Sequence, residues 1–405
     1  MKGKLQAPVQ RQYDVVIIGG AMMGSSTAWF LSTNKDFDGR VLVVEKDLTY
    51  EACSTTHTNS CMRQQFSSEL NVRISQFAAD FVKNLRDYMG GDARVPHLSI
   101  QNFGYLYLAD NAGFADSLRE GHAVQVAAGA GTKLLTPAEI KAAFPFYQLD
   151  DIVLGSLNTV DEGYWDGITV FDWWRRSARE HGVEYIQNEV VAMTRDASGR
   201  QVQSVTLASG EVVACGKVLN ASGPRAVRTS RMVGIELPVE PRKRFTWIFK
   251  AEKPLDRPLP LTIDPSGIHV RQDSENYYLA GGHAAHDPSV DYDDFAMDHD
   301  LWQSHVWPLL ATRIPQFEAI KVTNEWAGHY AYNVFDQNAI MGAHDVVENF
   351  YFLNGFSGHG LQQSPAMGRA TAELLTYGEY RSLDMTPFNY DRIAKGVRFV
   401  EKAVI

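Results

Sequence analysis

The pattern of hydrophobic positions predicts a buried parallel sheet with helices packed on it. Residues 13–18 form a β-branched run with almost no polar interruption, which is typical of a central parallel strand covered on both faces. Similar short runs predict strands over 40–44, 217–219 and 350–352. The small residues that follow Gly24 predict a helix lying close to the first strand. This order of strand, turn, helix and strand predicts a doubly wound α/β domain.

Two other stretches of the chain show the alternation of antiparallel strands. Residues 95–150, with FGYLYLA, and 236–331, with RFTWIFK, GIHVRQ and NYYLAGG, contain aromatic strands bounded by turns. They predict a second, mostly antiparallel sheet, a usual place for a substrate pocket lid. The first domain is then discontinuous and consists of 1–94, 151–235 and 332–405. The predicted fold class is α/β, in a two-domain α+β arrangement.

The composition is that of a globular protein with a net negative charge. Of 405 residues, 45% are hydrophobic and 21% charged, which excludes disordered and coiled-coil classes. The net charge of −10 argues against nucleic-acid binding, which depends on neutralising phosphates. No apolar run approaches the roughly 20 residues that span a bilayer, and the N-terminus lacks the apolar core of a signal peptide. We expect a cytoplasmic protein without a membrane span.

Cysteines and histidines predict neither a disulfide framework nor a metal site. Cys53, Cys61 and Cys215 are too few and too irregularly spaced for a disulfide scaffold or a zinc ribbon, so a reducing compartment is the simpler interpretation. The 12 histidines form no pair at metal-binding spacing beside acidic residues.

A glycine turn after the first strand is the first sign of chemistry. Gly19, Gly20 and Gly24 occupy a strand-to-helix turn, and the second strand ends in Glu45, 26 positions after Gly19 and 21 after Gly24. The helix N-terminus would face a pyrophosphate, and the acid would accept hydrogen bonds from an adenosine ribose. Ala21 stands where the usual motif has its second glycine. A nucleotide-free doubly wound fold is the alternative.

Two later segments repeat the signal of a strand that ends in small residues. The strand over 217–219 leads into Asn220-Ala221-Ser222-Gly223-Pro224, although any strand-to-turn junction can look like this. The strand over 350–352 leads into the glycine-rich loop 354–365 and then a helix over 366–377. Such a loop offers backbone N–H groups to an oxygen that becomes anionic. The alternative is an ordinary glycine loop with a proline near the first helical position.

Taken together, these segments resemble one enzyme superfamily. The segments are DVVIIGGAMMGSSTAWFLS, VLVVEKD, VLNASGPRA, EWAGHYAYNVFDQNAIMG and FYFLNGFSGHGLQQSPAMG. They resemble the D-amino-acid oxidase superfamily of FAD-dependent amine oxidoreductases, which includes glycine oxidase, sarcosine oxidase and dimethylglycine dehydrogenase. CMRQQFSSELNVRIS, YNVFDQN and GFSGHGLQQ look most like a mitochondrial branch of FAD-dependent oxidoreductase-domain proteins linked to complex I assembly, and its bacterial relatives. The resemblance implies a discontinuous Rossmann-like FAD-binding domain with an inserted substrate domain.

The resemblance also implies which residues contact FAD. Three segments carry most of them: the glycine turn with its ribose acid, the strand near 190 whose backbone meets adenine, and the loop over the flavin pyrimidine edge. The expected cofactor-binding residues are Gly19, Gly20, Ala21, Met23, Gly24, Glu45, Lys46, Thr56, His57, Val190, Val191, Ser222, Gly223, Gly355, Phe356, Ser357, Gly358, His359, Gly360, Leu361 and Gln362.

An arginine is expected to hold a substrate carboxylate. In glycine-oxidase-like members a Trp-x-Gly strand continues into that arginine, whereas Trp326-Ala327-Gly328 continues without one. Arg63 is the best substitute, because sarcosine-oxidase-like members place a substrate arginine just after the loop that contacts the flavin ring. A guanidinium fork suits a carboxylate, and a structural arginine is the alternative. Secondary anchors are Arg271 and Arg244, and further pocket candidates are Tyr330, Tyr332 and His269.

His57 raises the question of a covalent flavin. The segment Ser54-Thr55-Thr56-His57 resembles the segment by which dimethylglycine-dehydrogenase-like members bond histidine to the flavin methyl group. We favour FAD bound noncovalently with His57 packed near the ring, and a histidyl link is the alternative. A cysteinyl link near the C-terminal flavin loop is excluded, because no cysteine follows Cys215.

The resemblance implies an FAD-dependent oxidase or dehydrogenase of a small amine, which we take to be an N-substituted amino acid. Hydride would pass from the carbon next to nitrogen to flavin N5, and water would hydrolyse the imine. The role of the protein would be to position the substrate against the flavin and to supply electrostatic stabilisation. A 2-hydroxy-acid oxidoreductase is the second hypothesis, and a flavoprotein assembly or interaction factor is the third. The sequence does not determine whether oxygen or another acceptor reoxidises the flavin, nor does it determine the oligomeric state.

Overall fold

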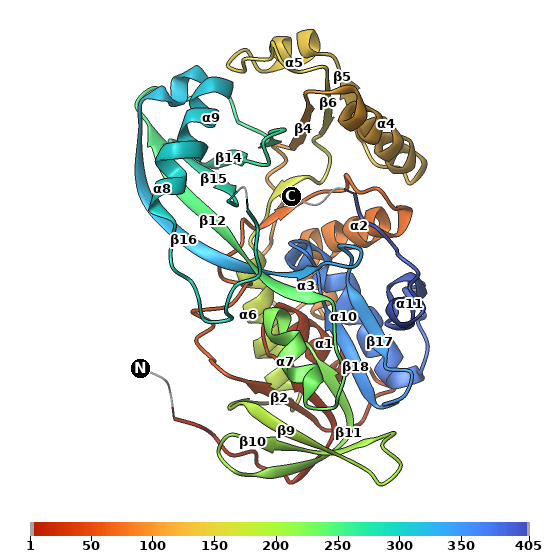
Figure 1. Cartoon of the computed structure of the whole chain (residues 1–405). Coiled ribbons are helices and arrows are strands. Elements are labelled where there is room, and N and C mark those ends of the chain that lie inside the picture. Colours follow the sequence, from red (N-terminus) through yellow and green to blue (C-terminus); the bar gives the residue numbers. More distant parts are fainter. Residues whose placement is uncertain (1–3, 285, 403–405) are drawn as a thin grey trace.

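Two eight-stranded sheets organise the chain, one above the other (Figure 1). The structure is a computed structural model that describes residues 4–284 and 286–402. In the first sheet the order is β17-β18-β11-β1-β2-β8, with β10 beside β11 and β9 beside β10. Its strands are β1 (Gln12–Ile18), β2 (Val41–Glu45), β8 (Glu184–Gln187), β9 (Val190–Arg195), β10 (Val202–Leu207), β11 (Val212–Asn220), β17 (Ile340–Ala343) and β18 (Phe350–Asn354).

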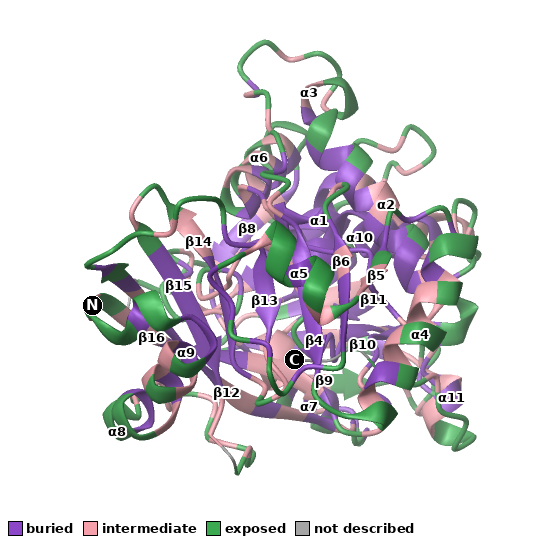
Figure 2. Cartoon of the chain, turned by 90° about the horizontal axis from the view of Figure 1, so that it is seen from above, coloured by how far each residue is buried: buried purple, intermediate pink, exposed green. Residues whose placement is uncertain are grey.

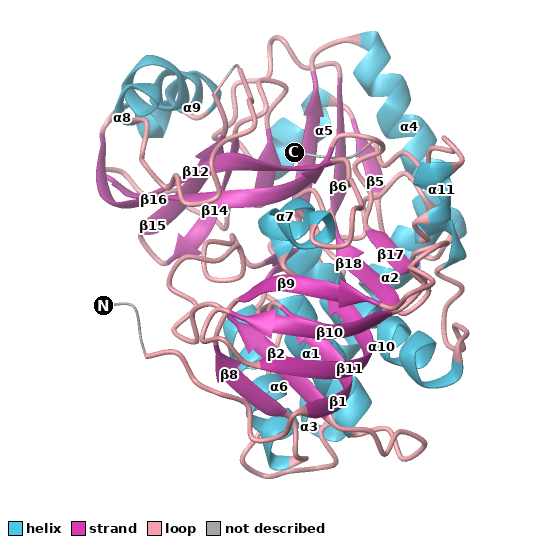
Figure 3. Ribbon diagram, turned by 60° about the horizontal axis from the view of Figure 1, so that its bottom comes forward, coloured by secondary structure: helices cyan, strands magenta, loops and turns pink. Residues whose placement is uncertain are grey.

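The centre of this sheet is parallel, and both of its faces are covered. β18, β11, β1, β2 and β8 run parallel, so their carboxyl ends meet at one edge. Val15 and Ile17 face a layer of helices, while Val16 and Ile18 face α7 and the β9–β10 hairpin (Figure 3). The layers are completed by α1 (Met22–Ser32), α2 (Glu69–Lys83), α6 (Gly167–Glu180), α10 (Gly360–Tyr377) and α7 (Ala226–Arg231). Burial on both faces explains the unbroken β-branched run.

The second sheet is mostly antiparallel and has one apolar face. Its order is β16-β12-β15-β14-β13-β4-β6-β5, and only the β13–β4 pair is parallel. Its strands are β4 (Tyr105–Ala109), β5 (Lys133–Leu135), β6 (Leu154–Asn158), β12 (Val239–Ala251), β13 (Leu261–Ile263), β14 (His269–Ser274), β15 (Tyr277–Gly282) and β16 (Ile320–Asn333). Trp247, Phe249 and Tyr278 pack with Trp302 and Phe317 in the core of this domain. The opposite face carries the polar side chains Arg244, Thr246, His269 and Tyr330, which line a cavity.

Further elements lie around the two sheets. Figure 2 shows the strands buried and the outer helices exposed. These elements are β3 (Cys61–Met62), β7 (Gly163–Tyr164), α3 (Leu85–Tyr88), α4 (Ala112–Ala127), α5 (Pro137–Ala143), α8 (His299–Leu301), α9 (Trp307–Arg313) and α11 (Asp391–Ala394). Among the residues described, no helix combines the length and the apolar character needed to cross a membrane.

The predicted α/β class with two sheets is confirmed, but the helix after the glycine-rich loop begins earlier than expected. The prediction placed it over 366–377, with Pro365 near its start, whereas α10 already begins at Gly360. Pro365 has no N–H to donate to the carbonyl of Leu361, four residues earlier. The Ser364 hydroxyl donates to that carbonyl instead, at 2.7 Å. The helix therefore passes through the proline, and 360–362 lie in its first turn.

The proposed domain division needs one boundary moved. Residues 151–235 were assigned to the first domain, but β6 (Leu154–Asn158) pairs with β4 and β5 in the second sheet. Hydrogen bonding along the β4 edge holds this segment there. We therefore propose 1–94, 159–235 and 332–405 for the first domain, and 95–158 and 236–331 for the second.

Candidate active site

A cavity of about 1010 Å³ lies between the two sheets, at the carboxyl ends of the parallel strands. Ile18, Glu45, Gln187 and Ala221 mark those strand ends in its wall. Ligands of doubly wound sheets bind at such an edge. The predicted residues that line it are Gly19, Ala21, Met23, Glu45, Lys46, His57, Arg63, Val190, Ser222, Gly223, Arg244, His269, Tyr330, Phe356, Ser357, Gly358, His359, Gly360, Leu361 and Gln362.

Other predicted residues lie outside the cavity wall, and most of them support it. A Cβ on Gly24 would lie 1.9 Å from the Gly19 carbonyl oxygen, so this glycine lets α1 approach β1. The Gly20 N–H donates to Glu45, and the Thr56 hydroxyl donates to the Tyr50 carbonyl, so both support neighbouring parts of the wall. Gly355 turns the flavin loop with φ +70. Val191 is exposed, because alternation along β9 turns it away from Val190.

The turn at the end of β1 can receive a phosphate. Gly19 has φ +97, and a Cβ there would lie 2.5 Å from the Ala221 carbonyl oxygen, so only glycine fits. α1 begins at Met22 with Ala21 at its N-cap and no side-chain cap. The positive end of the α1 dipole therefore faces the cavity. The Met22 N–H donates to the Thr55 hydroxyl at 3.3 Å, which ties this turn to the loop after β2.

Glu45 stands at the end of β2, as the predicted ribose acid should. One carboxylate oxygen accepts the Gly20 N–H at 2.8 Å and the other accepts the Asp47 N–H at 2.9 Å. Burial raises the pKa of Glu45, and the two backbone N–H groups oppose that shift. Its place in the cavity wall lets it accept hydrogen bonds from a sugar hydroxyl.

A short segment of the second domain reaches across the end of the cavity that lies beside Lys46 and Arg225. Tyr292, Asp293 and Phe295 line the wall, although no sequence signal marked them. The Asp293 carboxylate pairs with Arg225 beyond β11 and lies 3.8 Å from Lys46 beyond β2. These ion pairs join the two domains over the cavity.

The glycine-rich loop after β18 forms the opposite wall. Ser357 and Gly358 have positive φ values, +49 and +94. The Ser357 N–H donates to the Ala331 carbonyl at 3.0 Å, and its hydroxyl accepts the Asn333 N–H at 2.9 Å. A Cβ on Gly358 would lie 2.5 Å from the Tyr330 ring. The loop therefore lies tightly on β16, just before the first turn of α10.

Arg63, the predicted substrate anchor, is buried beside this loop. Its side chain is 1% exposed and lines the cavity. Its backbone N–H donates to the Gln362 side chain at 2.8 Å, and Nη2 donates to His359 Nε2 at 2.8 Å. Nη1 donates to the Gln65 carbonyl. The guanidinium lies 4.1 Å from the centre of the Phe66 ring, so its plane is fixed by both packing and hydrogen bonds.

The second sheet presents Arg244, His269 and Tyr330 to the cavity. Arg244 forms a two-point ion pair with Asp287, at 2.8 and 3.0 Å, and lies over the Tyr330 ring at 4.5 Å. His269 accepts the Asn59 amide at 2.6 Å. Burial, reinforced by the charges of Arg271 and Arg244, lowers the pKa of His269 to about 3, so its ring is neutral at physiological pH.

Arg271 does not line the cavity, which corrects its place among the anchors. Its guanidinium lies 3.0 Å from Asp273 and donates to the carbonyls of Gln272 and Asn59. These partners orient it as a structural side chain. Tyr332 also lies outside the wall, with Arg242 at 4.3 Å from its ring centre.

His57 lies in the cavity wall on the loop after β2. Its Nδ1 donates to the Cys53 carbonyl at 3.0 Å, and its ring lies 5.9 Å from that of Phe295. The same loop passes close to β16, because a Cβ on Gly328 would lie 2.8 Å from the His57 Cβ.

Sequence reasoning missed several residues of the wall. Thr55 and Asn59 flank predicted residues on the loop after β2, and Tyr105 lies in the FGYLYLA strand. The motifs beside these residues could be recognised in the sequence. Whether their side chains point into the cavity, however, depends on how the two sheets meet. Among the described residues, no group of three or more His, Cys, Asp or Glu side chains could hold a metal ion.

The residues present fit FAD. The glycine turn and the start of α1 would hold the pyrophosphate, Glu45 the ribose, and Val190 on β9 the adenine. Phe356 to Gln362, with backbone N–H groups at the start of α10, would hold the flavin ring. The observation that supports this fit is the tight backbone packing at Gly19 and Gly24, which leaves no room for a Cβ and brings the start of α1 close to β1 at the cavity wall.

Comparison with known proteins agrees with this site. The family described as FAD dependent oxidoreductase (DAO) matches residues 14–374. "FAD-dependent oxidoreductase domain-containing protein 1" of Xenopus laevis is 35% identical, covering 97% of this chain and 85% of that protein. "Sarcosine oxidase subunit beta" of Rhizobium meliloti is 25% identical, covering 98% and 93%. The crystal structure of L-proline dehydrogenase from P. horikoshii superposes with a TM-score of 0.82 and 25% identity, covering 96% and 99%. The chain therefore belongs to the DAO family and is an FAD-dependent oxidoreductase.

Proposed function

We propose that this enzyme oxidises a small secondary amino acid at its CH–NH bond, and that Arg63 holds the substrate carboxylate. The observation that carries the proposal is the position of Arg63. It is a buried guanidinium in the cavity wall, joined through Gln362 and His359 to the loop that would hold the flavin ring. A carboxylate bound there would lie beside the flavin site.

The relatives support this substrate class. Sarcosine oxidase, sarcosine dehydrogenase of Mus musculus, at 23% identity, and L-proline dehydrogenase are named for sarcosine and proline. Both compounds are α-amino acids whose nitrogen carries two carbon substituents. An arginine for the carboxylate and a cavity that accepts a secondary nitrogen would suit either.

The residues around Arg63 would also favour the reactive form of the amine. Only a neutral amine readily gives up hydride from its α carbon. Transfer of the substrate from water into the cavity disfavours its charged ammonium form, which lowers the pKa of the amine, and Arg63 in the wall offers that ammonium no negative charge. The His269 ring is neutral, so it would add a polar contact without a negative charge that would stabilise the ammonium form. When bound, FAD supplies the two-electron acceptor, and water then hydrolyses the imine.

Anaerobic mixing tests the proposal. The purified protein is mixed with N-methylated, N-carboxyalkyl, cyclic and D-amino acids and with 2-hydroxy acids, and flavin absorbance is followed. We expect bleaching by a secondary amine that bears a carboxylate, and little by its ester. Bleaching by hydroxy acids alone would identify a hydroxy-acid oxidoreductase instead. A flavin that none of these compounds reduces would favour an assembly or interaction role.

A further inference from the structure

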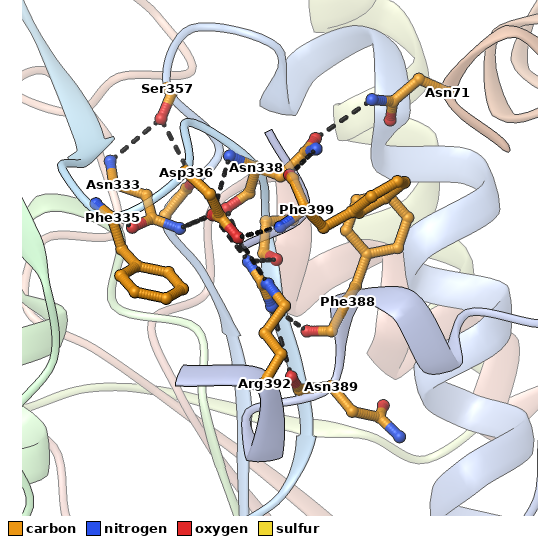
Figure 4. A network of polar contacts seen from close by, with 12 residues as sticks. Asn71, Asn333, Phe335, Asp336, Asn338, Ser357, Phe388, Asn389, Arg392 and Phe399 are labelled. Atoms are coloured by element: carbon orange, nitrogen blue, oxygen red, sulfur yellow. Dashed lines mark hydrogen bonds and ion pairs between the residues drawn. The ribbon is translucent and has the colours of Figure 1, made fainter. Parts of the chain in front are cut away.

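A buried polar network lies behind the cavity wall, outside the residues that would touch substrate or FAD (Figure 4). It contains Asn333, Asp336 and Asn338 of the YNVFDQN motif, whose role the site did not explain. It also includes Arg392 of α11 and the chain near Phe399. These side chains are almost wholly buried, and Asp336 is 0% exposed.

The centre of the network is an ion pair that reaches the flavin loop. Arg392 donates to both carboxylate oxygens of Asp336, at 2.7 and 3.0 Å. The same carboxylate accepts the Asn333 amide at 2.7 Å and the Phe399 N–H at 3.0 Å. The Asn333 backbone N–H donates to the Ser357 hydroxyl in the flavin loop. Asp336 therefore joins the C-terminal segment to the left-handed residue of that loop.

A second branch reaches the segment that carries Arg63. Glu401, 1% exposed, accepts the Ser67 N–H at 2.9 Å and the Asn71 amide at 2.8 Å, both at the start of α2. Asn71 in turn accepts the Gln363 amide of α10 at 3.0 Å. Gln362, which precedes Gln363 on α10, accepts the Arg63 backbone N–H. Glu401 thus ties together the two elements between which Arg63 lies.

The carboxylate sets the direction of these hydrogen bonds. Both Glu401 oxygens accept a hydrogen bond, one from the Ser67 N–H and the other from the Asn71 NH₂, so Asn71 turns its oxygen toward Gln363. The same NH₂ donates to the Asn338 oxygen at 3.0 Å, and Asn338 donates to the Phe399 carbonyl at 2.6 Å. Reversing the Asn71 amide would place donor against donor at Gln363. One acceptor-only group therefore orients a chain of three amides.

We propose that Glu401, on the C-terminal segment, is a positioning residue that sets the distance between Arg63 and the flavin loop. Its effect on substrate affinity rests on the proposed function, whereas its effect on the flavin does not. An anchor must hold its ligand within a fraction of an ångström, so small displacements of α2 against α10 carry a large cost in binding.

The test replaces the carboxylate without changing its size. Glu401→Gln replaces one of the two acceptor oxygens by an NH₂, which must then face either the Ser67 N–H or the Asn71 NH₂. Gln363→Met breaks the same chain from α10 should the first variant fold poorly. Glu373→Gln is the matched control: Glu373 is a largely buried carboxylate on α10 that accepts the Arg381 N–H at 2.8 Å, away from the cavity. The probe is cyclopentanecarboxylate, a carboxylate shaped like proline that has no nitrogen to oxidise, titrated by flavin absorbance.

We expect both network variants to bind the probe on the order of 10-fold or more weakly. The midpoint potential of their bound FAD should fall, because the displaced loop stabilises the reduced ring less well. Glu373→Gln should stay within about twofold of the unchanged protein. Variants that match this control in probe affinity and in potential would overturn the proposal. If the unchanged protein binds no carboxylate, the proposed substrate class fails, and the potential and visible spectrum alone then decide the role of Glu401.

Discussion

Arg63 is the residue on which substrate recognition is predicted to depend. When one partner of a buried guanidinium–carboxylate pair in a closed cavity is removed, the binding free energy typically falls by about 2–5 kcal/mol. This loss corresponds to about 30-fold to several thousand-fold in affinity. We expect Arg63→Ala to raise the half-saturation of the best amino acid by that amount. Arg73→Ala, which removes an exposed arginine from α2, is the control. An unchanged half-saturation would exclude Arg63 as the anchor, and Arg244 would be tested next.

Positions 24 and 21 are predicted to differ sharply in their tolerance of substitution. A Cβ at position 24 would lie 1.9 Å from the Gly19 carbonyl, so Gly24→Val should push α1 away from β1 and abolish FAD retention. Ala21→Gly restores the usual motif glycine and should retain FAD. The FAD to protein absorbance ratio after gel filtration measures both, with circular dichroism to verify folding. FAD retained by Gly24→Val would refute this account of the turn.

Glu162 should make stability depend on pH. Burial raises the pKa of Glu162 to about 8, although bonds from Gln65, Gln64 and Asn158 and the charge of Arg63 act in the opposite direction. Between its ordinary value of 4.5 and about 8, the folded protein holds a proton that the unfolded chain has released. The free energy of unfolding should therefore fall as pH rises through this window. Urea titrations from pH 5 to 9 should show a flatter dependence for Glu162→Gln.

At the scale of elements, α10 passes through a proline because a neighbouring serine takes over its hydrogen bond. Ser364→Ala leaves the half-buried Leu361 carbonyl without its side-chain donor and should lower the unfolding free energy by about 1 kcal/mol. Pro365→Ala restores a backbone N–H for the same carbonyl. In the double variant the loss should therefore be smaller, as measured by urea unfolding. Additive effects would show that the two residues act independently.

At the scale of the whole molecule, the two domains are expected to hold one FAD per chain without a covalent bond. The purified protein should be yellow, and acid precipitation should release the flavin into the supernatant. A colourless protein that takes up no added FAD would contradict the assigned site. A yellow polypeptide band after denaturation, absent from His57→Ala, would instead demonstrate a histidyl link. The cytoplasmic location stays a prediction.

The sequence alone determined the parts of this protein that depend on local order. The strand-turn-helix at 13–24, the acid at the end of β2 and the loop before α10 were all predictable, because neighbouring residues produce them. Two aromatic inserts likewise predicted the second sheet. What identified the family was the combination of these motifs along one chain.

Only the tertiary structure decided which side chains share the cavity. The sequence offered Arg63 as the first candidate anchor and Arg271 as a secondary one, and the structure shows that Arg63 reaches the glycine-rich loop before α10 while Arg271 pairs with Asp273. Tyr292, Asp293 and Phe295 line the wall, where Asp293 forms ion pairs with Arg225 and Lys46. Glu401 meets Asn71 across 330 positions. Such contacts form between segments far apart in sequence, where no periodicity records them. Their geometry follows from how the two sheets and the C-terminal segment pack, which local patterns do not specify.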